Sequence, residues 1–205
     1  MALSYPLSFP SVSVPVGLTF SAVSIVGESR SPFTGESQIY VHGGGWYELE
    51  VRMPPMARAD AEDVVAFLLG LNGVQGTFAI GDLANTSPRG TWAGSPKVLG
   101  AHAAGVKTVA MDGFSVGGTV KNGDWLQAGT GASAHLHKVV KDATADGSGL
   151  LTLEIWPGTR AALADNDTFV TSSPKGVWRL ANNQRGWSIE GAGLYGISFS
   201  CREAL

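Results

Sequence analysis

The chain has 205 residues, of which 44 % are hydrophobic, so it can bury a sizeable core as one domain or two small ones. Its formal net charge is -3 and it has no run of Lys or Arg, which argues against a dedicated nucleic-acid surface, because such a surface needs a basic stripe to displace counterions. Only 15 % of residues are charged and 28 are glycine, a composition typical of a β-rich protein with many tight turns.

Three strands are predicted at the start of the chain. Residues 16–26 alternate apolar and polar side chains, as a half-buried strand does, and 27–35 is a predicted loop. Strands follow at 36–42 and 45–53, joined by a hairpin turn across the three glycines between them, which tolerate positive φ. On the last strand, the residues expected to face the core are Tyr47, Leu49, Val51 and Met53.

From Met56 the apolar pattern changes to a helical period, and we place a helix at about 56–71. Acidic residues crowd its start, where the helix dipole favours negative charge, and glycines end it. A short strand at 76–80 follows. These elements predict an antiparallel sheet with one helix packed on it.

The composition changes again after residue 82. Four glycines and two prolines between 82 and 105 indicate a linker or an exposed loop. Short β-patterned runs then recur at the regular spacing of a small barrel or sandwich. They lie at 107–111, 124–128, 134–141, 150–156, 168–170 and 177–180.

We assign residues 85–174 to an inserted β-barrel or sandwich module, with 146–149 as its clearest hairpin turn. Residues 1–84 and 175–205 form the core that carries the insertion, because 186–203 alternates as a strand expected to return to the first sheet. The predicted fold is therefore mainly β with one helix: a β-sandwich or sheet-plus-helix core carrying an inserted small β-barrel domain.

The cysteine content and the N-terminal residues indicate the cellular compartment in which the chain folds. Cys201 is the one cysteine and lies on the predicted last strand, so no intramolecular disulfide is possible and we expect a buried thiol. The N-terminal residues contain several prolines and no Lys or Arg, unlike a secretory signal peptide. The apolar runs are too short to span a bilayer. These features predict folding in a cytoplasm without membrane insertion.

Two motifs match catalytic or cofactor patterns by letter. Residues 113–117 read Gly-Phe-Ser-Val-Gly, a nucleophile-elbow pattern, and Asp124 and His135 follow in hydrolase order. The elbow needs a helix directly after its serine, whereas 117–123 is a poor helix. Residues 191–196 match a dinucleotide fingerprint, but too little chain follows for the helix and strand that it requires. We predict no catalytic and no cofactor-binding residue, and keep a small esterase as a minor hypothesis.

No metal site is predicted. His135 and His137 lie two apart on a predicted strand and would share a face, but no third ligand is nearby, so we expect half-exposed strand histidines. The Asp-Asn-Asp run at 165–167 lacks the alternating ligand spacing of a calcium loop and indicates a turn.

The six tryptophans offer large contact areas with a polar edge, which suits core packing, subunit contacts or a sugar-stacking platform. Trp92 lies between glycines in the predicted loop. It is the best candidate for exposure and hence for contact with a partner.

Two sets of short segments carry a family resemblance. The first set comprises Leu3-Ser4-Tyr5-Pro6-Leu7, Ser31-Pro32-Phe33-Thr34-Gly35 with Gln38, Trp46, Pro54-Pro55-Met56 and Ala66-Phe67-Leu68. The second comprises Gly123-Asp124-Trp125-Leu126, Leu136-His137-Lys138-Val139-Val140, Leu153-Glu154-Ile155-Trp156-Pro157 and Pro174-Lys175-Gly176-Val177-Trp178-Arg179-Leu180. Together they resemble the minor tail proteins of long-tailed, siphovirus-like bacteriophages and gene-transfer particles, over nearly the whole chain.

Within that group the chain is most similar to the distal tail protein, which resembles a tail-tube subunit carrying an inserted β domain, so the resemblance implies a tail-tube-like core. The resemblance implies a structural virion protein of the tail tip or baseplate, with no enzyme activity and no cofactor. Its expected partners are further copies of itself in a hexameric ring, the tail tube protein, the baseplate hub protein, and the tape-measure protein and DNA in transit through a central channel. The alternatives are a tail-tube or terminator subunit, or a carbohydrate-binding adsorption module that meets a host glycan.

Two segments are candidates for assembly contacts. The prolines of the N-terminal segment 3–9 suit extended docking against a neighbour, and the loop 31–38 belongs to the family-like cassette. The alternative is that both segments merely cover their own domain. The candidate interface residues are Leu3, Tyr5, Pro6, Ser31, Pro32, Phe33, Thr34 and Gln38.

Overall fold

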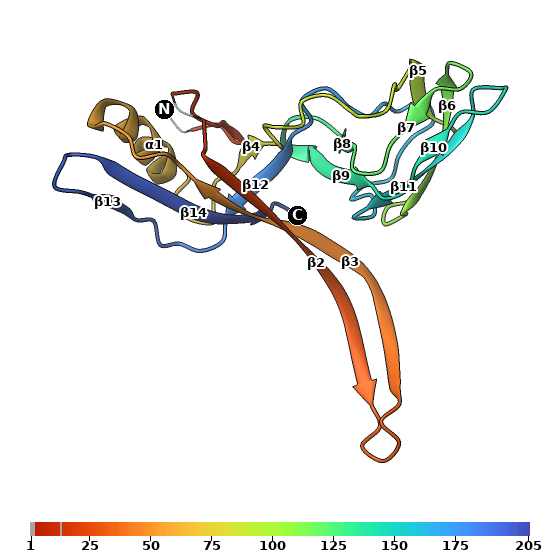
Figure 1. Ribbon diagram of the computed structural model, residues 1–205, viewed down its shortest axis with the longest axis horizontal. Helices are drawn as coiled ribbons and strands as arrows, with labels where there is room; N and C mark the ends of the chain where they lie inside the picture. The colour runs from red at the N-terminus through yellow and green to blue at the C-terminus, as the bar shows by residue number, and fades with distance from the viewer. Residues whose placement is uncertain (1–2, 13) are drawn as a thin grey trace.

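The computed structural model describes residues 3–12 and 14–205 and confirms a mainly β fold with one helix. Its strands form a mixed seven-stranded sheet, a strongly curled antiparallel half-barrel of five strands, and a two-stranded ribbon. Figure 1 shows the helix and the half-barrel at opposite ends of the body, with one long hairpin projecting away from it.

The seven-stranded sheet forms the centre of the molecule, in the order β1-β4-β12-β14-β3-β2, with β13 paired to β14 off this path. The β1–β4 pair is parallel, and the other pairs are antiparallel. The bounds are β1 Leu7–Ser8, β2 Gly17–Arg30, β3 Ser37–Arg52, β4 Phe78–Ile80, β12 Gly176–Leu180, β13 Trp187–Ile189 and β14 Tyr195–Glu203.

The helix α1, Arg58–Gly70, confirms the helix predicted at about 56–71. Asn72 and Gly73 follow it with φ values of 48° and 69°, and this left-handed geometry ends the helix. Phe67 of the helix packs edge-on against Phe78 of β4, with 5.4 Å between ring centroids. The core face predicted on β3 is also confirmed, since Tyr47, Leu49, Val51 and Met53 are all buried.

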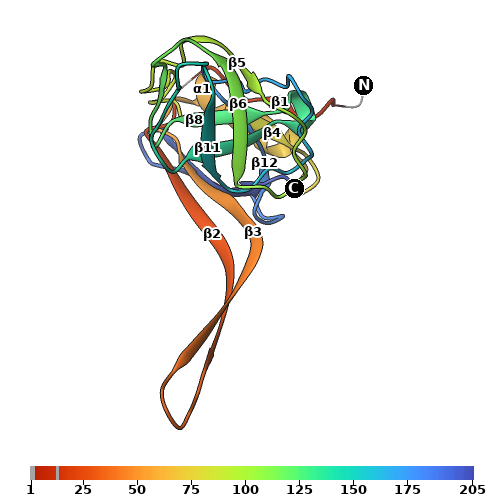
Figure 2. The same cartoon turned by 90° about the vertical axis from the view of Figure 1, so that its right-hand side faces the viewer.

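The half-barrel has the strand order β5-β6-β11-β9-β8 and encloses a second apolar core. It is a curled half-barrel whose edge strands are β5 and β8, and its strands all lie within 94–156 (Figure 2). The bounds are β5 Gly94–Val98, β6 Thr108–Phe114, β8 Trp125–Ala128, β9 His135–Val139 and β11 Leu151–Trp156, with a ribbon of β7 Thr119–Val120 and β10 Ala143–Thr144 and a 3-10 turn at Gly131–Ser133.

Two predictions in this region were wrong in detail. The stretch 82–105 was expected to be a linker or exposed loop, but it contains β5, because Val98 is buried opposite Met111 and the glycine at the start of the strand allows close approach to β6. The strand expected at 168–170 is only an isolated bridge between Gln127 and Val170.

The position of the first hairpin turn was also wrong. The chain turns at residues 31–36, where Ser31 Oγ accepts the N–H groups of Phe33 and Thr34 and Gly35 has a φ of 75°. Within the predicted loop 27–35, residues 27–30 therefore belong to β2, and only 31–35 lie in the turn. The glycines at 43–45 lie within β3 and form no turn.

This hairpin has two parts, which we call the base and the arm. In the base, residues 17–24 of β2 pair with residues 45–52 of β3 inside the sheet. The arm is residues 25–44, and the register shifts at its start, between Ser24 and Val26. Figures 1 and 2 show the arm extending beyond the body as a two-stranded ribbon.

At the C-terminus, the predicted single run 186–203 is a hairpin of β13 and β14. Its turn carries Gly191 and Gly193 of the dinucleotide-like motif, and the Glu190 N–H donates to the Leu194 carbonyl. As expected, the segment returns to the first sheet, since β14 pairs with both β3 and β12. Cys201 is buried on β14, and burial raises the pKa of its thiol.

Candidate functional site

The arm exposes several apolar side chains, and three of them share one face. Val26 and Val41 are register partners, and Ile39 lies two residues from Val41, so all three share that face. Their exposed fractions are 51 %, 72 % and 54 %. Glu28 and Arg30 lie on the same face nearer the tip. A contiguous apolar patch of this kind is unusual on a monomer and marks an interaction surface.

The tip of the arm holds most of the predicted interface residues. Phe33 is 95 % exposed, and Pro32, Thr34 and Gln38 are exposed as well. Arg30 Nε donates to the Gly35 carbonyl at 3.2 Å, which fixes the turn. Because the tip contacts no part of the body in Figure 1, these residues do not cover their own domain.

The N-terminal candidates lie elsewhere and do cover their own domain. The Tyr5 hydroxyl donates to the Gly70 carbonyl at the end of α1, at 2.7 Å. Leu7 of β1 then pairs with Phe78, which adds this segment to the sheet edge. Leu3 is 57 % exposed beside the same helix end. The structure therefore separates the two predicted assembly segments, and Tyr5 packs within the chain itself.

Trp92 was expected to be exposed, and the structure corrects this. Its Nε1 donates to Asp124 Oδ2 at 3.0 Å, and its ring lies 5.7 Å from that of Phe114. The indole is half-buried against the second core. It belongs to the packing of the half-barrel.

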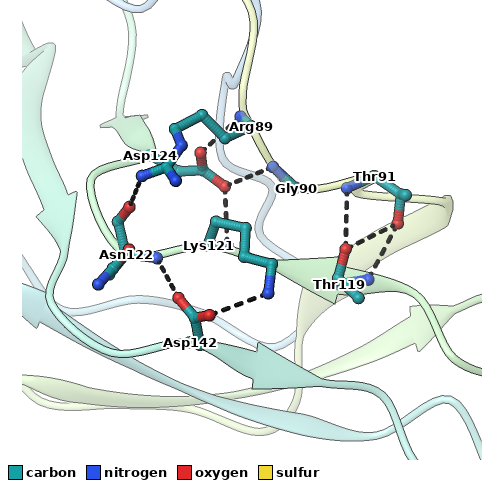
Figure 3. Close-up of polar contacts among 8 residues, drawn as sticks. All are labelled: Arg89, Gly90, Thr91, Thr119, Lys121, Asn122, Asp124 and Asp142. Carbon is teal, nitrogen blue, oxygen red and sulfur yellow. Dashed lines mark hydrogen bonds and ion pairs between the residues drawn. The ribbon is translucent and has the colours of Figure 1, made fainter.

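Asp124 holds the chain before β5 in place. Its buried carboxylate accepts the backbone N–H groups of Arg89 at 2.6 Å, Gly90 at 3.1 Å and Lys121 at 3.0 Å (Figure 3). Asp142 fixes the neighbouring turn, since it accepts hydrogen bonds from Lys121 Nζ and the Asn122 N–H. The Asp124 carboxylate thus accepts hydrogen bonds mainly from backbone N–H groups. Within residues 14–205, no side-chain hydrogen bond joins it to Ser115 or His135.

The histidines of β9 are more buried than predicted. His137 is fully buried, and its Nδ1 lies 2.8 Å from the Pro157 carbonyl. Burial lowers the pKa of His137 to about 4, so the ring is neutral at pH 7. In the part of the chain that the structure describes, no group of three or more His, Cys, Asp or Glu side chains could hold a metal ion.

Glu203 of β14 joins the sheet to the half-barrel. Arg160 Nε donates to Glu203 Oε1 at 3.0 Å, His135 Nδ1 lies 3.3 Å from the same oxygen, and the Tyr47 N–H donates to Oε2 at 3.3 Å. Burial raises the pKa of Glu203, but the nearby His135, the Arg160 guanidinium and the Tyr47 N–H outweigh burial and leave the pKa below its usual range. The carboxylate is therefore ionised and fixes the base of the hairpin to the half-barrel.

An open aromatic groove of about 610 Å³ lies beside this junction, between the base of the hairpin and β8–β9. Tyr47 contacts the rings of Trp125 and Trp156, with centroid separations of 5.3 and 4.7 Å. Lys138 Nζ lies 4.3 Å from the Trp125 ring centroid, a cation–π contact. Sequence reasoning missed this groove, because its residues come from five separate strands.

Gly45 is the sequence signal for the groove. A Cβ atom at this position would lie 3.0 Å from Trp156 and 3.1 Å from the Val23 carbonyl oxygen. The glycine therefore lets the indole of the half-barrel pack directly on the backbone of β3.

Neither a scan against protein-family models nor a search of curated proteins finds a match for this chain. Among residues 3–12 and 14–205, no helix is long and apolar enough to cross a membrane.

Proposed function

We propose that this protein is a structural subunit that assembles into a ring, in the position of the distal tail protein of a long-tailed bacteriophage or gene-transfer particle. The observation that carries the proposal is the arm, which projects from the body with an apolar face and an exposed Phe33 at its tip. The proposed position at the tail tip rests on the segments of the sequence that resemble tail proteins.

The physics of the arm favours assembly. An isolated two-stranded ribbon is marginally stable in water, and its outer edges present unpaired N–H and C=O groups. Natural proteins protect such edges, whereas here β2 is the last strand of the sheet order and its arm half has no neighbour beyond β3. Arms from neighbouring copies would satisfy these groups edge to edge and cover the face formed by Val26, Ile39 and Val41.

Assembly through arms also suits a channel wall. Identical head-to-tail contacts close into a ring when the rotation between copies is fixed, and paired strands make a stiff wall. A net charge of -3 suits a channel that must not grip passing DNA. In this role the protein would bind the tail tube protein and the baseplate hub protein, and the tape-measure protein and DNA would pass through the ring.

The first test is the mass and shape of the purified protein, by light scattering over a concentration series together with negative-stain imaging. We expect open-centred rings. A variant with Val26→Ser, Ile39→Thr and Val41→Thr should stay folded but lose the rings.

The matched control is Val116→Ser, because Val116 is 72 % exposed on the half-barrel, as Val41 is on the arm. This variant should form rings as the unmodified protein does. A protein that remains monomeric through the concentration series, or rings that survive the triple arm substitution, would contradict the proposal.

A further inference from the structure

We propose that the aromatic groove is the receptor for the β13–β14 hairpin of a second copy of this chain, and that this contact forms the head-to-tail joint between ring neighbours. The proposal rests on the ring-forming function above and names the surfaces that meet.

The groove has an apolar lining and one cation. Its floor is formed by aromatic rings of the base and the half-barrel, and it continues along Val139, the last residue of β9, and Val140 after it. Among the described residues, Lys138 has no carboxylate partner and is held only over the Trp125 ring. An occupant should therefore bring apolar side chains and a negative charge. The principal lining residues are Phe20, Ala22, Tyr47, Trp125, Trp156 and Lys138.

The β13–β14 hairpin offers those features at the other end of the molecule. Trp187 and Ile189 share one face of the hairpin and are 40 % and 61 % exposed, and Leu194 in the turn is 37 % exposed. Glu190 lies in the same turn and is exposed. The hairpin thus carries an apolar patch beside a carboxylate, which complements the groove and Lys138.

The groove and the β13–β14 hairpin lie at different ends of the molecule, and this placement determines how two copies can be arranged. In Figure 1 the β13–β14 hairpin lies at the end occupied by α1, whereas the groove lines the half-barrel side. Two unlike surfaces at opposite ends produce a heterologous contact, which makes a ring or a filament rather than a two-fold dimer. The groove also borders the base of the arm, so a neighbour seated there would lie next to the arm contacts.

The lining of the groove favours a protein occupant over an oligosaccharide. A sugar stacks on an open aromatic face, but Trp125 is only 4 % exposed and its ring lies beneath the Lys138 ammonium. Apolar side chains with a nearby carboxylate can fill the groove and pair with Lys138 without displacing it.

Disulfide trapping tests the contact directly, because the native Cys201 is buried and does not compete. Lys138→Cys and Glu190→Cys chains, carrying different tags and co-expressed, should form a mixed disulfide dimer on mild oxidation. Neither variant alone should cross-link to itself, since a heterologous contact does not bring identical positions together. The matched control pairs Val116→Cys with Glu190→Cys and should give no dimer.

Charge exchange gives a second readout. Lys138→Glu and Glu190→Lys should each weaken ring association at least about tenfold, because each places like charges together, and the double exchange should return most of that loss. Thermal melts of each variant check that the monomer stays folded.

The outcomes separate the two proposals. If rings form but no mixed cross-link is found, the groove contact is wrong and the proposed ring function is unaffected. The same conclusion follows if neither charge change weakens ring association. A protein that never associates would overturn both. Quenching of tryptophan fluorescence by neutral oligosaccharides, together with absent cross-links, would overturn the groove contact in favour of glycan binding.

Discussion

The base and the arm belong to the same two strands and continue one hairpin, yet they differ in what covers them. In the base, alternate residues such as Leu49 and Val51 are 1 % and 0 % exposed under the helix and the half-barrel. In the arm, Ile39 and Val41 are 54 % and 72 % exposed. Strand pairing alone therefore does not decide burial here.

This difference in burial shows which part of the hairpin contributes to the free energy of folding. Base residues gain it from apolar burial and from the Glu203 junction, whereas the arm gains little beyond its own ladder of hydrogen bonds. A given kind of substitution should therefore lower the free energy of unfolding when it removes a contact of the base or of the body around it. The same kind of substitution in the arm should leave the free energy of unfolding of the monomer nearly unchanged. Four matched pairs of variants test this.

The largest effect is expected from breaking the buried ion pair. Arg160→Ala leaves the Glu203 carboxylate without its cation at the base, which should lower the free energy of unfolding by about 3–5 kcal/mol. Arg30→Ala removes an exposed arginine from the arm and should change it by less than about 1 kcal/mol. Urea unfolding of both variants measures the difference, and similar losses in the two would refute the distinction.

Apolar truncation on β3 compares two positions of one strand. Leu49→Ala removes a buried side chain from the base and should cost about 2–5 kcal/mol, including the cavity that it leaves. Ile39→Ala in the arm should stay within about 0.5 kcal/mol. Thermal melting at fixed protein concentration checks both, and an Ile39→Ala loss as large as that of Leu49→Ala would show that the arm packs on its own body.

Acid should weaken the body through His137. Its folded pKa of about 4 lies below the ordinary histidine pKa of 6.5, so the unfolded state binds the proton more tightly. The stabilising contribution is complete above pH 6.5 and is lost as the pH falls toward 4, to a total of about 3 kcal/mol. The free energy of unfolding, measured by denaturation at several pH values from 7.5 to 4.5, should depend less on pH in the His137→Gln variant than in the unmodified protein.

His42 is the arm counterpart in this test. Because its side chain is exposed, His42→Gln should change the free energy of unfolding by less than about 0.5 kcal/mol at pH 7.5. A profile that is equally steep in wild type and His137→Gln would assign the acid sensitivity to another group.

The smallest effect is expected at the glycines of β3. Gly45→Val forces branched methyl groups toward Trp156 and the Val23 carbonyl, which should cost about 1–3 kcal/mol. Nothing lies within 4 Å of a Cβ at Gly43, so Gly43→Val should be neutral or slightly stabilising in a strand. Chemical denaturation distinguishes the two, and a tolerated Gly45→Val would mean that the Trp156 contact is not tight.

Much of the fold could be predicted because its signals are local. Apolar alternation identified the buried face of β3, and a change of period identified α1 within two residues at its start. Candidate interface residues 31–38 were identified as a segment, although the sequence placed them in a loop beside a glycine turn and not at the tip of an arm.

The misplaced turn, the half-buried Trp92 and the aromatic groove share one cause. Glycines are permitted in turns and also in strands where another side chain packs on the backbone, and only the approach of Trp156 to Gly45 decides between the two. Likewise, whether an indole in a glycine-rich stretch is exposed depends on whether a distant carboxylate such as Asp124 reaches its Nε1.

The period of each element, the mainly β class, the helix α1 and the burial of Cys201 follow from neighbouring side chains along one strand or helix, so they can be predicted from the sequence. That one hairpin has a covered base and an uncovered arm, and that Trp125, Trp156 and Lys138 meet in a groove, follows only from the way distant segments pack together. Burial depends on which distant segments come together, and the chain's local pattern is the same whether or not they do.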